Sequence, residues 1–203
     1  MRLHFYRIDE KREIVLGKIT SVKEGTGSVA GKVMNVQIEG TKWEDGAEKP
    51  EKMDISFWNG EKSKLADRVK KANLKEGDTI MVDVYNNDGK YIGNGFTFNG
   101  HVVIPATEER GERNIFIGVV GSMTEDKDNR YYKISMPVKN ADKETEWVSI
   151  SFWNDETKQM ADRAKKVIRK REDKNPRVAV ACGANKPYNG KPSYSGMFFE
   201  MIS

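Results

Sequence analysis

Apolar and polar residues alternate along four short stretches of the chain. Such alternation predicts β-strands with one buried face, because successive side chains of a strand point to opposite sides. Glycine turns and phenylalanine-bearing ends in the later part of each half predict two further strands there. The alternating stretches are VMNVQI (33–38), KMDISFW (52–58), YKISMPV (132–138) and WVSISFW (147–153), and the later strands lie within 85–98 and 187–199.

One amphipathic helix is predicted in each half, after the second alternating stretch. Segments 61–73 and 156–170 place apolar residues at helical spacing, with lysines and arginines on the opposite side. The basic side is typical of a solvated helix face. The apolar positions are Leu65, Ala66, Val69 and Ala72 in the first segment, and Met160, Ala161, Ala164, Val167 and Ile168 in the second.

The two halves are copies of one another. ISFWNGEKSKLADRVKK (55–71) and ISFWNDETKQMADRAKK (150–166) match at eleven of seventeen positions without a gap. A weaker match upstream places Gly17 over Gly118. An internal repeat of this length indicates two similar structural units in tandem.

Each copy shows three strands, a helix and two strands, which is the order of the OB-fold. The sequence therefore predicts an all-β protein with one short helix per unit, made of two tandem five-stranded OB-fold barrels. We expect a first domain over 1–103, a linker over 104–113 (IPATEERGER) and a second domain over 114–203. Residues 1–13 precede the first copy as an extension, either an extra strand or a subunit clasp.

The alternation also predicts where the tryptophans point. If Val148, Ile150 and Phe152 face the core, Trp147 and Trp153 face outward. By the same rule Trp58 faces outward in the first copy, and Trp43 lies beyond its second strand. Large aromatic rings normally seek burial, so something should cover them at least part of the time. Stacked nucleobases or a protein interface would both serve, and geometry leaves the two open.

Composition and charge exclude several classes of protein. A net charge of +4 permits an anionic partner without requiring one. No apolar run approaches the roughly 20 residues of a membrane span, and the start of the chain lacks the apolar core of a signal peptide. Cys182 is the only cysteine, so no internal disulfide can form, and a cytoplasmic location is expected.

Candidate chemistry is sparse. His4 and His101 have no companions at ligand spacing, so neither a metal site nor a cofactor is expected. No catalytic motif or phosphate-binding glycine loop is present, and the chain is not expected to be an enzyme.

TEWVSISFWN (145–154), followed by a helix with MADRAKK, resembles the third strand and helix of bacterial-type single-stranded DNA-binding proteins. NVQIEGTKW (35–43) resembles the second strand of that family and the tryptophan after it. The resemblance implies stacking of DNA bases on aromatic residues, including some in the hairpin between the last two strands. The implied stacking residues are Trp43, Trp58, Trp147, Trp153, Tyr85, Tyr91, Tyr188 and Tyr194.

If the resemblance holds, the protein binds single-stranded DNA without strong sequence preference, in replication, recombination or repair, and RNA is a further possible ligand. Two barrels per chain suggest a homodimer that presents four. The chain stops at FFEMIS without the acidic tail through which the family recruits enzymes, so recruitment by that route is not expected. Candidate phosphate contacts are Lys42, Lys52, Lys90, Arg130, Lys133, Lys186 and Lys191.

Two other hypotheses remain open. The barrels could form a protein-interaction scaffold whose tryptophans are buried in an oligomer. They could instead bind RNA or an oligosaccharide, because the same barrel face serves those ligands in other OB-folds.

Overall fold

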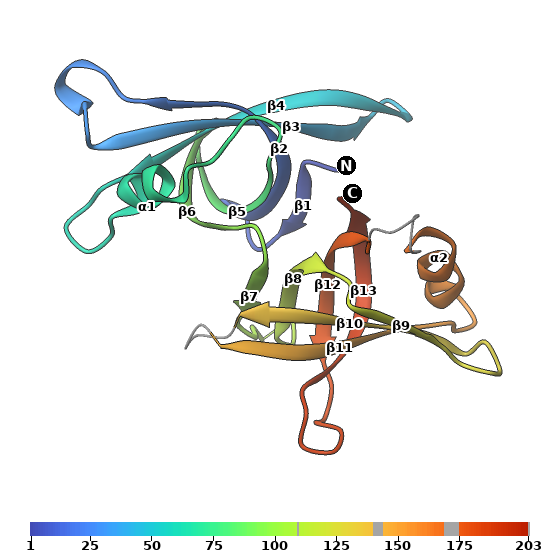
Figure 1. Cartoon of the computed structure of the whole chain (residues 1–203). Coiled ribbons are helices and arrows are strands. Elements are labelled where there is room, and N and C mark those ends of the chain that lie inside the picture. Colours follow the sequence, from blue (N-terminus) through green and yellow to red (C-terminus); the bar gives the residue numbers. More distant parts are fainter. Residues whose placement is uncertain (109, 140–143, 169–174, 203) are drawn as a thin grey trace. The chain divides into compact units, whose positions relative to one another are not determined.

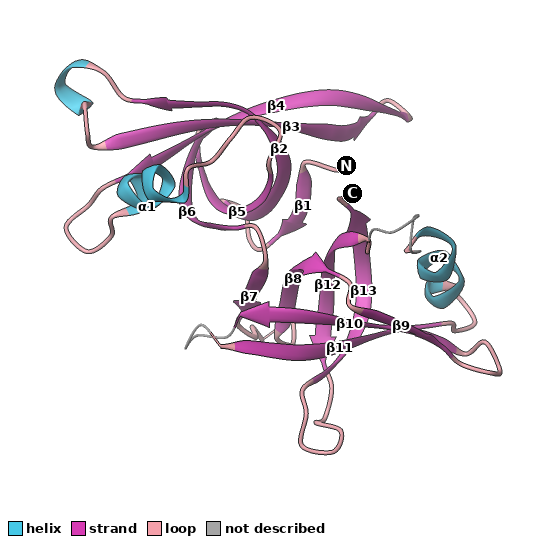
Figure 2. Ribbon diagram, in the orientation of Figure 1, coloured by secondary structure: helices cyan, strands magenta, loops and turns pink. Residues whose placement is uncertain are grey.

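The computed structural model describes residues 1–108, 110–139, 144–168 and 175–202 (Figure 1). The chain divides into two compact units, Met1–Phe98 and Asn99–Ser203, called unit 1 and unit 2 below. Both are built mostly from β-strands, and within the described ranges each has one short α-helix (Figure 2).

Unit 1 is a closed barrel with one additional strand. The first half of β2 pairs with β5 and its second half pairs with β3, while β4 and β6 run parallel to each other and complete the ring. The additional strand is β1, which pairs with β2 and is not part of this ring. The elements are β1 (His4–Arg7), β2 (Arg12–Glu24), a 3-10 turn (Gly27–Val29), β3 (Val33–Glu44), β4 (Ala47–Trp58), α1 (Leu65–Ala72), β5 (Thr79–Asn87) and β6 (Lys90–Thr97).

Unit 2 repeats this plan with one strand divided in two. β8 pairs with β12 and β9 pairs with β10, so β8 and β9 together take the place of the continuous β2. β7 pairs with β8 just as β1 pairs with β2. The elements are β7 (Gly100–Ile104), β8 (Arg113–Val119), β9 (Ser122–Glu125), β10 (Tyr131–Lys139), β11 (Thr145–Trp153), α2 (Met160–Val167), β12 (Arg177–Ala184) and β13 (Ser193–Met201).

The predicted fold class is confirmed: two OB-like β units, each with its helix between the third and fourth barrel strands. Both helices begin later than predicted, at Leu65 and Met160. The delay arises because Asn59 forms a β-bridge with Lys64 and Asn154 forms one with Gln159, which keeps the intervening residues in a loop. Positions 169 and 170 of the second predicted helix lie outside the described residues.

The chain divides at a different place from the expected domain boundary. Residues 100–103, expected in the first domain, belong to β7, which pairs with β8 inside unit 2. The ends of the expected linker, Ile104 and Arg113, belong to these two strands and pair with each other. Between them, the backbones of Thr107 and Arg110 exchange two hydrogen bonds, at 2.7 and 3.3 Å. Proline, glycine and charge mark hairpin connections as well as linkers, and the sequence pattern does not separate the two.

Each unit has its own core, and the alternating stretches face it as predicted. Ile55 and Phe57 on β4 are fully buried, as are Ile150 and Phe152 on β11. α1 contributes Leu65 to the first core, and α2 contributes Ala161 and Ala164 to the second. The opposite face of β3–β4 and of β10–β11 is called the outer face below.

Three chemical features of the described residues complete the picture. Neither α1 nor α2 has the length and apolarity to cross a membrane. Within the described ranges, no three His, Cys, Asp or Glu side chains gather in a metal-binding group. Cys182 is buried, which raises the pKa of its thiol, and its Sγ donates to the carbonyl oxygen of Asn114 at 3.3 Å.

Candidate nucleic-acid interface

All four tryptophans are exposed. The exposed fractions are 64% for Trp43, 42% for Trp58, 55% for Trp147 and 47% for Trp153. Trp58, Trp147 and Trp153 lie on the outer face because their neighbours Phe57, Val148 and Phe152 fill the cores. Trp43 follows the same alternation from the core residues Val36 and Ile38, further back on β3. The facing predicted from the sequence therefore agrees with the structure.

The outer face of unit 2 brings three aromatic rings onto two adjacent strands. Trp153 pairs in register with Tyr131, and their ring centroids lie 5.1 Å apart at an interplanar angle of 53°. Trp147 lies at the other end of β11 and packs over Gly121: a Cβ atom there would come 2.4 Å from Cζ3 of the indole. The glycine thus lets the ring rest on the backbone while its remaining surface stays open.

In unit 1 the two tryptophans lie far apart along one hairpin. Trp58 ends β4, and its cross-strand partner is Val33. β3 and β4 form a long hairpin (Figure 1). Trp43 pairs with Glu48, one pair before the last pair at the hairpin tip, Glu44 with Ala47. Asp45 and Gly46 close this tip with positive φ angles of 53° and 77°, which suits a tight two-residue turn.

The four predicted tyrosines separate into two groups. Tyr85 on β5 and Tyr188 in the β12–β13 hairpin are exposed, the latter by 74%. Tyr91 and Tyr194 are partly buried. They pair in register with the core residues Ile55 and Ile150 and pack against the cores. Burial raises the pKa of both phenols. Tyr91 and Tyr194 therefore do not join the outer face, because their register turns them inward.

The predicted cationic contacts also fall in different environments. Lys52 and Lys133 lie on the outer faces. Lys133 belongs to the outer-face cross-strand pair next to Tyr131 and Trp153, whereas Lys52 lies six residues before Trp58 along β4. Lys90, Lys186 and Lys191 are exposed in the β5–β6 and β12–β13 hairpins.

Two of the predicted cations are held by carboxylates instead. Lys42 lies on the core side of the β3–β4 hairpin, opposite Trp43, with its Nζ 3.5 Å from Glu44 and 4.0 Å from Glu51. The Nε of Arg130 donates to Asp126 at 2.9 Å, which raises the pKa of the guanidinium and lowers that of the carboxyl. Strand alternation from Trp43 would have indicated the inward direction of Lys42.

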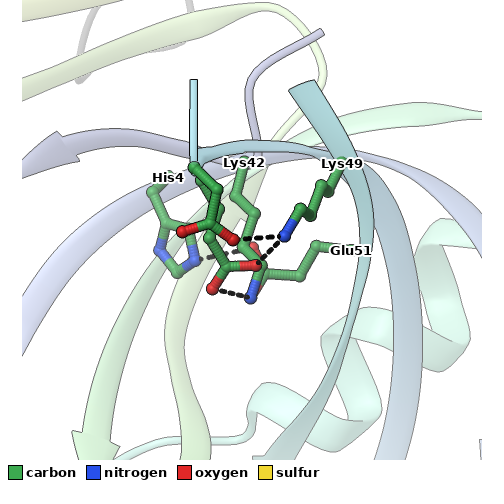
Figure 3. Close-up of polar contacts among 6 residues, drawn as sticks. His4, Lys42, Lys49 and Glu51 are labelled. Carbon is green, nitrogen blue, oxygen red and sulfur yellow. Dashed lines mark hydrogen bonds and ion pairs between the residues drawn. The ribbon is translucent and has the colours of Figure 1, made fainter. Parts of the chain in front are cut away.

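Two features of this region were missed from the sequence. The first is Tyr131, whose signal was its place on the same alternation as Lys133. The second is a polar cluster on the core side of the β3–β4 hairpin, in which His4 joins Glu51 at 3.0 Å (Figure 3). His4 also joins Glu13 at 2.8 Å. The members of this cluster come from three strands that only the fold brings together.

Comparisons with known proteins give structural similarity only. No protein-family profile and no curated protein matches the chain. A small single-stranded DNA-binding protein from Mycoplasma pneumoniae matches with 14% identity over 43% of this chain and 91% of its own, at a TM-score of 0.34.

Two further solved structures are similar at the same level. The mitochondrial single-stranded DNA-binding protein Rim1 of S. cerevisiae matches with 22% identity over 44% of this chain and 92% of its own, at a TM-score of 0.33. A replication protein A heterotrimer bound to single-stranded DNA matches with 14% identity over 95% of this chain and 49% of that chain, at 0.29. Because these TM-scores are below 0.5, the similarities carry no functional argument, and a functional assignment has to come from the exposed side chains.

Proposed function

We propose that the outer faces of the two units bind single-stranded DNA with little sequence preference. The observation that carries this proposal is the exposure of Trp147 and Trp153 on one face of one strand. Six residues of strand separate them, or about 20 Å at roughly 3.3 Å per residue. Two flat rings displayed along one sheet face suit an extended strand of unpaired bases.

Stacking explains sequence tolerance. Every base presents a flat π-face, and base–aromatic stacking is worth about 1–3 kcal/mol per base by alanine substitution. The positions between the tryptophans are serines, Ser149 and Ser151, which are small and uncharged and leave room for bases and phosphates. Lys133 on the neighbouring strand would neutralise a phosphate, so affinity should fall as salt rises.

A fluorescence titration tests the proposal. Adding poly-dT to the full chain at low salt should strongly quench the intrinsic tryptophan emission, because stacked indoles lose their solvent environment and contact bases. Raising the salt concentration should reverse the quenching. An unchanged spectrum at micromolar protein would contradict the proposal.

Sedimentation of the same samples identifies the competing interpretation. If the tryptophans are covered by a second copy of the chain, Trp147→Ala should lower the sedimenting mass while poly-dT leaves the emission unchanged. If the proposal is correct, poly-dT quenches the tryptophan emission, and Trp147→Ala leaves the sedimenting mass of the protein unchanged.

The proposal includes a cellular setting. We place the protein in DNA replication, recombination or repair in the cytoplasm, as a homodimer presenting four OB-like units. A solitary buried thiol, Cys182, suits a reducing compartment. Sedimentation at equilibrium would report the dimer, and competition of poly-rU against poly-dT would report the preference between RNA and DNA.

A further inference from the structure

The outer faces of the two units differ in charge at positions that the repeat makes equivalent. Trp58 with its partner Val33, and Trp153 with its partner Tyr131, occupy the same place at the ends of their strand ladders. Counting two residues at a time from these pairs aligns the two outer faces position by position, because alternate residues share a face.

The first difference in charge lies on β4 and β11, the strands that carry Trp58 and Trp153. The position held by Ser149 on β11 is held by Asp54 on β4, and the position of Trp147 is held by Lys52. Asp54 is exposed, and its Oδ1 accepts a hydrogen bond from Nε2 of Gln37 at 2.9 Å. The hydrogen bond holds a carboxylate in the middle of the unit 1 face.

β3 and β10, which neighbour these strands, also differ in charge, and again the unit 1 strand is the more negative. Glu39 on β3 corresponds to Pro137 on β10, and Asn35 corresponds to Lys133. Over the five aligned cross-strand pairs, the unit 1 face carries one lysine and two carboxylates, whereas the unit 2 face carries two lysines and no carboxylate. All of these residues belong to the described part of the chain.

We propose that the two units bind single-stranded DNA unequally, with the tight site on unit 2 and a face on unit 1 that Asp54 weakens. The inference rests on the proposed function. Every nucleotide brings a negative phosphate, so a fixed carboxylate beside its path opposes binding, most strongly at low salt. Lys52 also leaves unit 1 without the stacking ring that Trp147 supplies in unit 2.

A short labelled dT oligomer of about ten nucleotides, close to the length one OB-like unit covers, separates the two sites in the full chain. In fluorescence anisotropy at low salt, we expect one tight binding event and a second, weaker one. Trp153→Ala should weaken the tight event about tenfold or more, whereas Trp58→Ala should change it less than twofold.

Charge variants with isosteric controls test the role assigned to the carboxylate. Asp54→Asn keeps the acceptor for Gln37 and should strengthen the weak event about three- to tenfold, while Asp54→Glu should not. Conversely, Ser149→Asp should weaken the tight event about tenfold relative to Ser149→Asn. Both effects should shrink at high salt.

The outcomes distinguish the two proposals. Suppose that the wild-type chain binds the oligomer. If Trp58→Ala and Trp153→Ala then weaken the tight event equally, or Asp54→Asn does not strengthen the weak event, the proposed difference between the units is overturned and the proposed function stands. If the wild-type chain binds no oligomer, both are overturned. Should Ser149→Asp fail to fold, the Asp54 variants alone decide.

Discussion

The side-chain oxygen of Asn154 accepts a hydrogen bond from the backbone N–H of Ala161, with 2.9 Å between the two atoms. The same oxygen lies 3.3 Å from the backbone nitrogen of Asp162. The first N–H groups of a helix have no partner within it. Gln159, which precedes α2, makes no capping bond of its own, so Asn154 caps the helix from the end of β11.

The same arrangement recurs in unit 1 and explains the repeated pentapeptide ISFWN. Asn59 accepts from the backbone N–H of Asp67 in α1 at 3.2 Å. Within the pentapeptide, Ile55 and Phe57 fill the core, Trp58 lies on the outer face, and Asn59 secures the following helix. One short segment thus serves the core, the outer face and the helix, which leaves few of its positions free to vary.

Removing this cap should destabilise unit 2. For Asn154→Ala we expect the free energy of unfolding to fall by about 1 kcal/mol, the usual cost of losing a side-chain cap. Urea titration followed by circular dichroism would measure it. Asn154→Asp retains the acceptor and should keep most of the stability. An alanine variant as stable as the wild type would show that the observed hydrogen bonds contribute nothing.

Glycines on β6 and β13 make room for the phenylalanines of the pentapeptide. A Cβ atom on Gly93 would lie 2.3 Å from Cε1 of Phe57, and one on Gly196 would lie equally close to Phe152. We expect Gly93→Ala to lower the free energy of unfolding by about 1–3 kcal/mol, the range for overpacked cores. Thermal or urea unfolding gives the measurement.

Gly95, two residues further along the same strand, supplies the control. A Cβ atom there would meet nothing within 4 Å. Gly95→Ala should therefore leave stability nearly unchanged. Equal losses for the two variants would attribute the effect to strand conformation and not to the ring of Phe57.

Sequence reasoning predicted the strand order and the outward tryptophans because both follow from local alternation. The sequence-based predictions were wrong where the structure depends on pairing between residues that lie far apart in the sequence. β7 was assigned to the wrong side of the unit boundary, because only pairing shows that His101 opposite Phe116 repeats His4 opposite Val15. These pairings also reveal that the two histidines are counterparts, which their spacing along the chain conceals.

For a related reason, the directions of some candidate-site side chains follow from the sequence and those of others do not. Trp147 and Trp153 lie in regular strands, where alternation is dependable. Tyr91 and Tyr194 follow hairpin turns, and their direction depends on a parallel pairing with Ile55 and Ile150 that no local pattern shows. The ion pairs that hold Arg130 could not be read from composition, because surface charges are common on every face.

Trp147 should matter for binding and little for folding. Its ring is 55% exposed and rests on Gly121, so Trp147→Ala should weaken binding of poly-dT by about 1–3 kcal/mol with an unchanged melting temperature. Anisotropy titration and thermal melting report the two quantities. Tyr194→Ala, which removes a ring packed against the core, should show the reverse pattern. Unfolding caused by Trp147→Ala would refute the assignment of this ring to a binding face.

Lys133 and Arg130 should contribute differently to phosphate binding although they lie three residues apart. Lys133 lies on the outer face, whereas Arg130 is already held by Asp126 and Asp128, at 2.9 and 3.4 Å. We expect Lys133→Gln to reduce the slope of log affinity against log salt by about 0.7, the value for one phosphate of a single strand. Arg130→Gln should change it less. Equal slopes for both variants would mean that the ion pairs open on binding.

His4 makes the stability of unit 1 depend on pH. Its ring bonds to Glu51 on β4 (Figure 3) and to Glu13 on β2. The hydrogen bond to Glu13 is the largest cause that raises the pKa of His4 above its ordinary 6.5. In unit 2, His101 bonds instead to the neutral amide of Asn114, at 2.7 Å. Glu13 and Asn114 are counterparts, each two residues before the strand partner of its histidine.

The sign of the effect follows from which form of His4 the folded state prefers. A pKa raised on folding means that the protonated form is favoured, so the added stability is fully present below about pH 6.5 and is lost as the pH rises through the folded-state pKa. We expect the difference in free energy of unfolding between the wild type and Glu13→Asn, which copies unit 2, to be largest near pH 5.5–6. It should shrink steadily above that, and His4→Gln should remove the same pH-dependent part. Urea titrations from pH 5.5 to 9 would measure it, and a difference that grew with pH would show that the cluster favours neutral His4 instead.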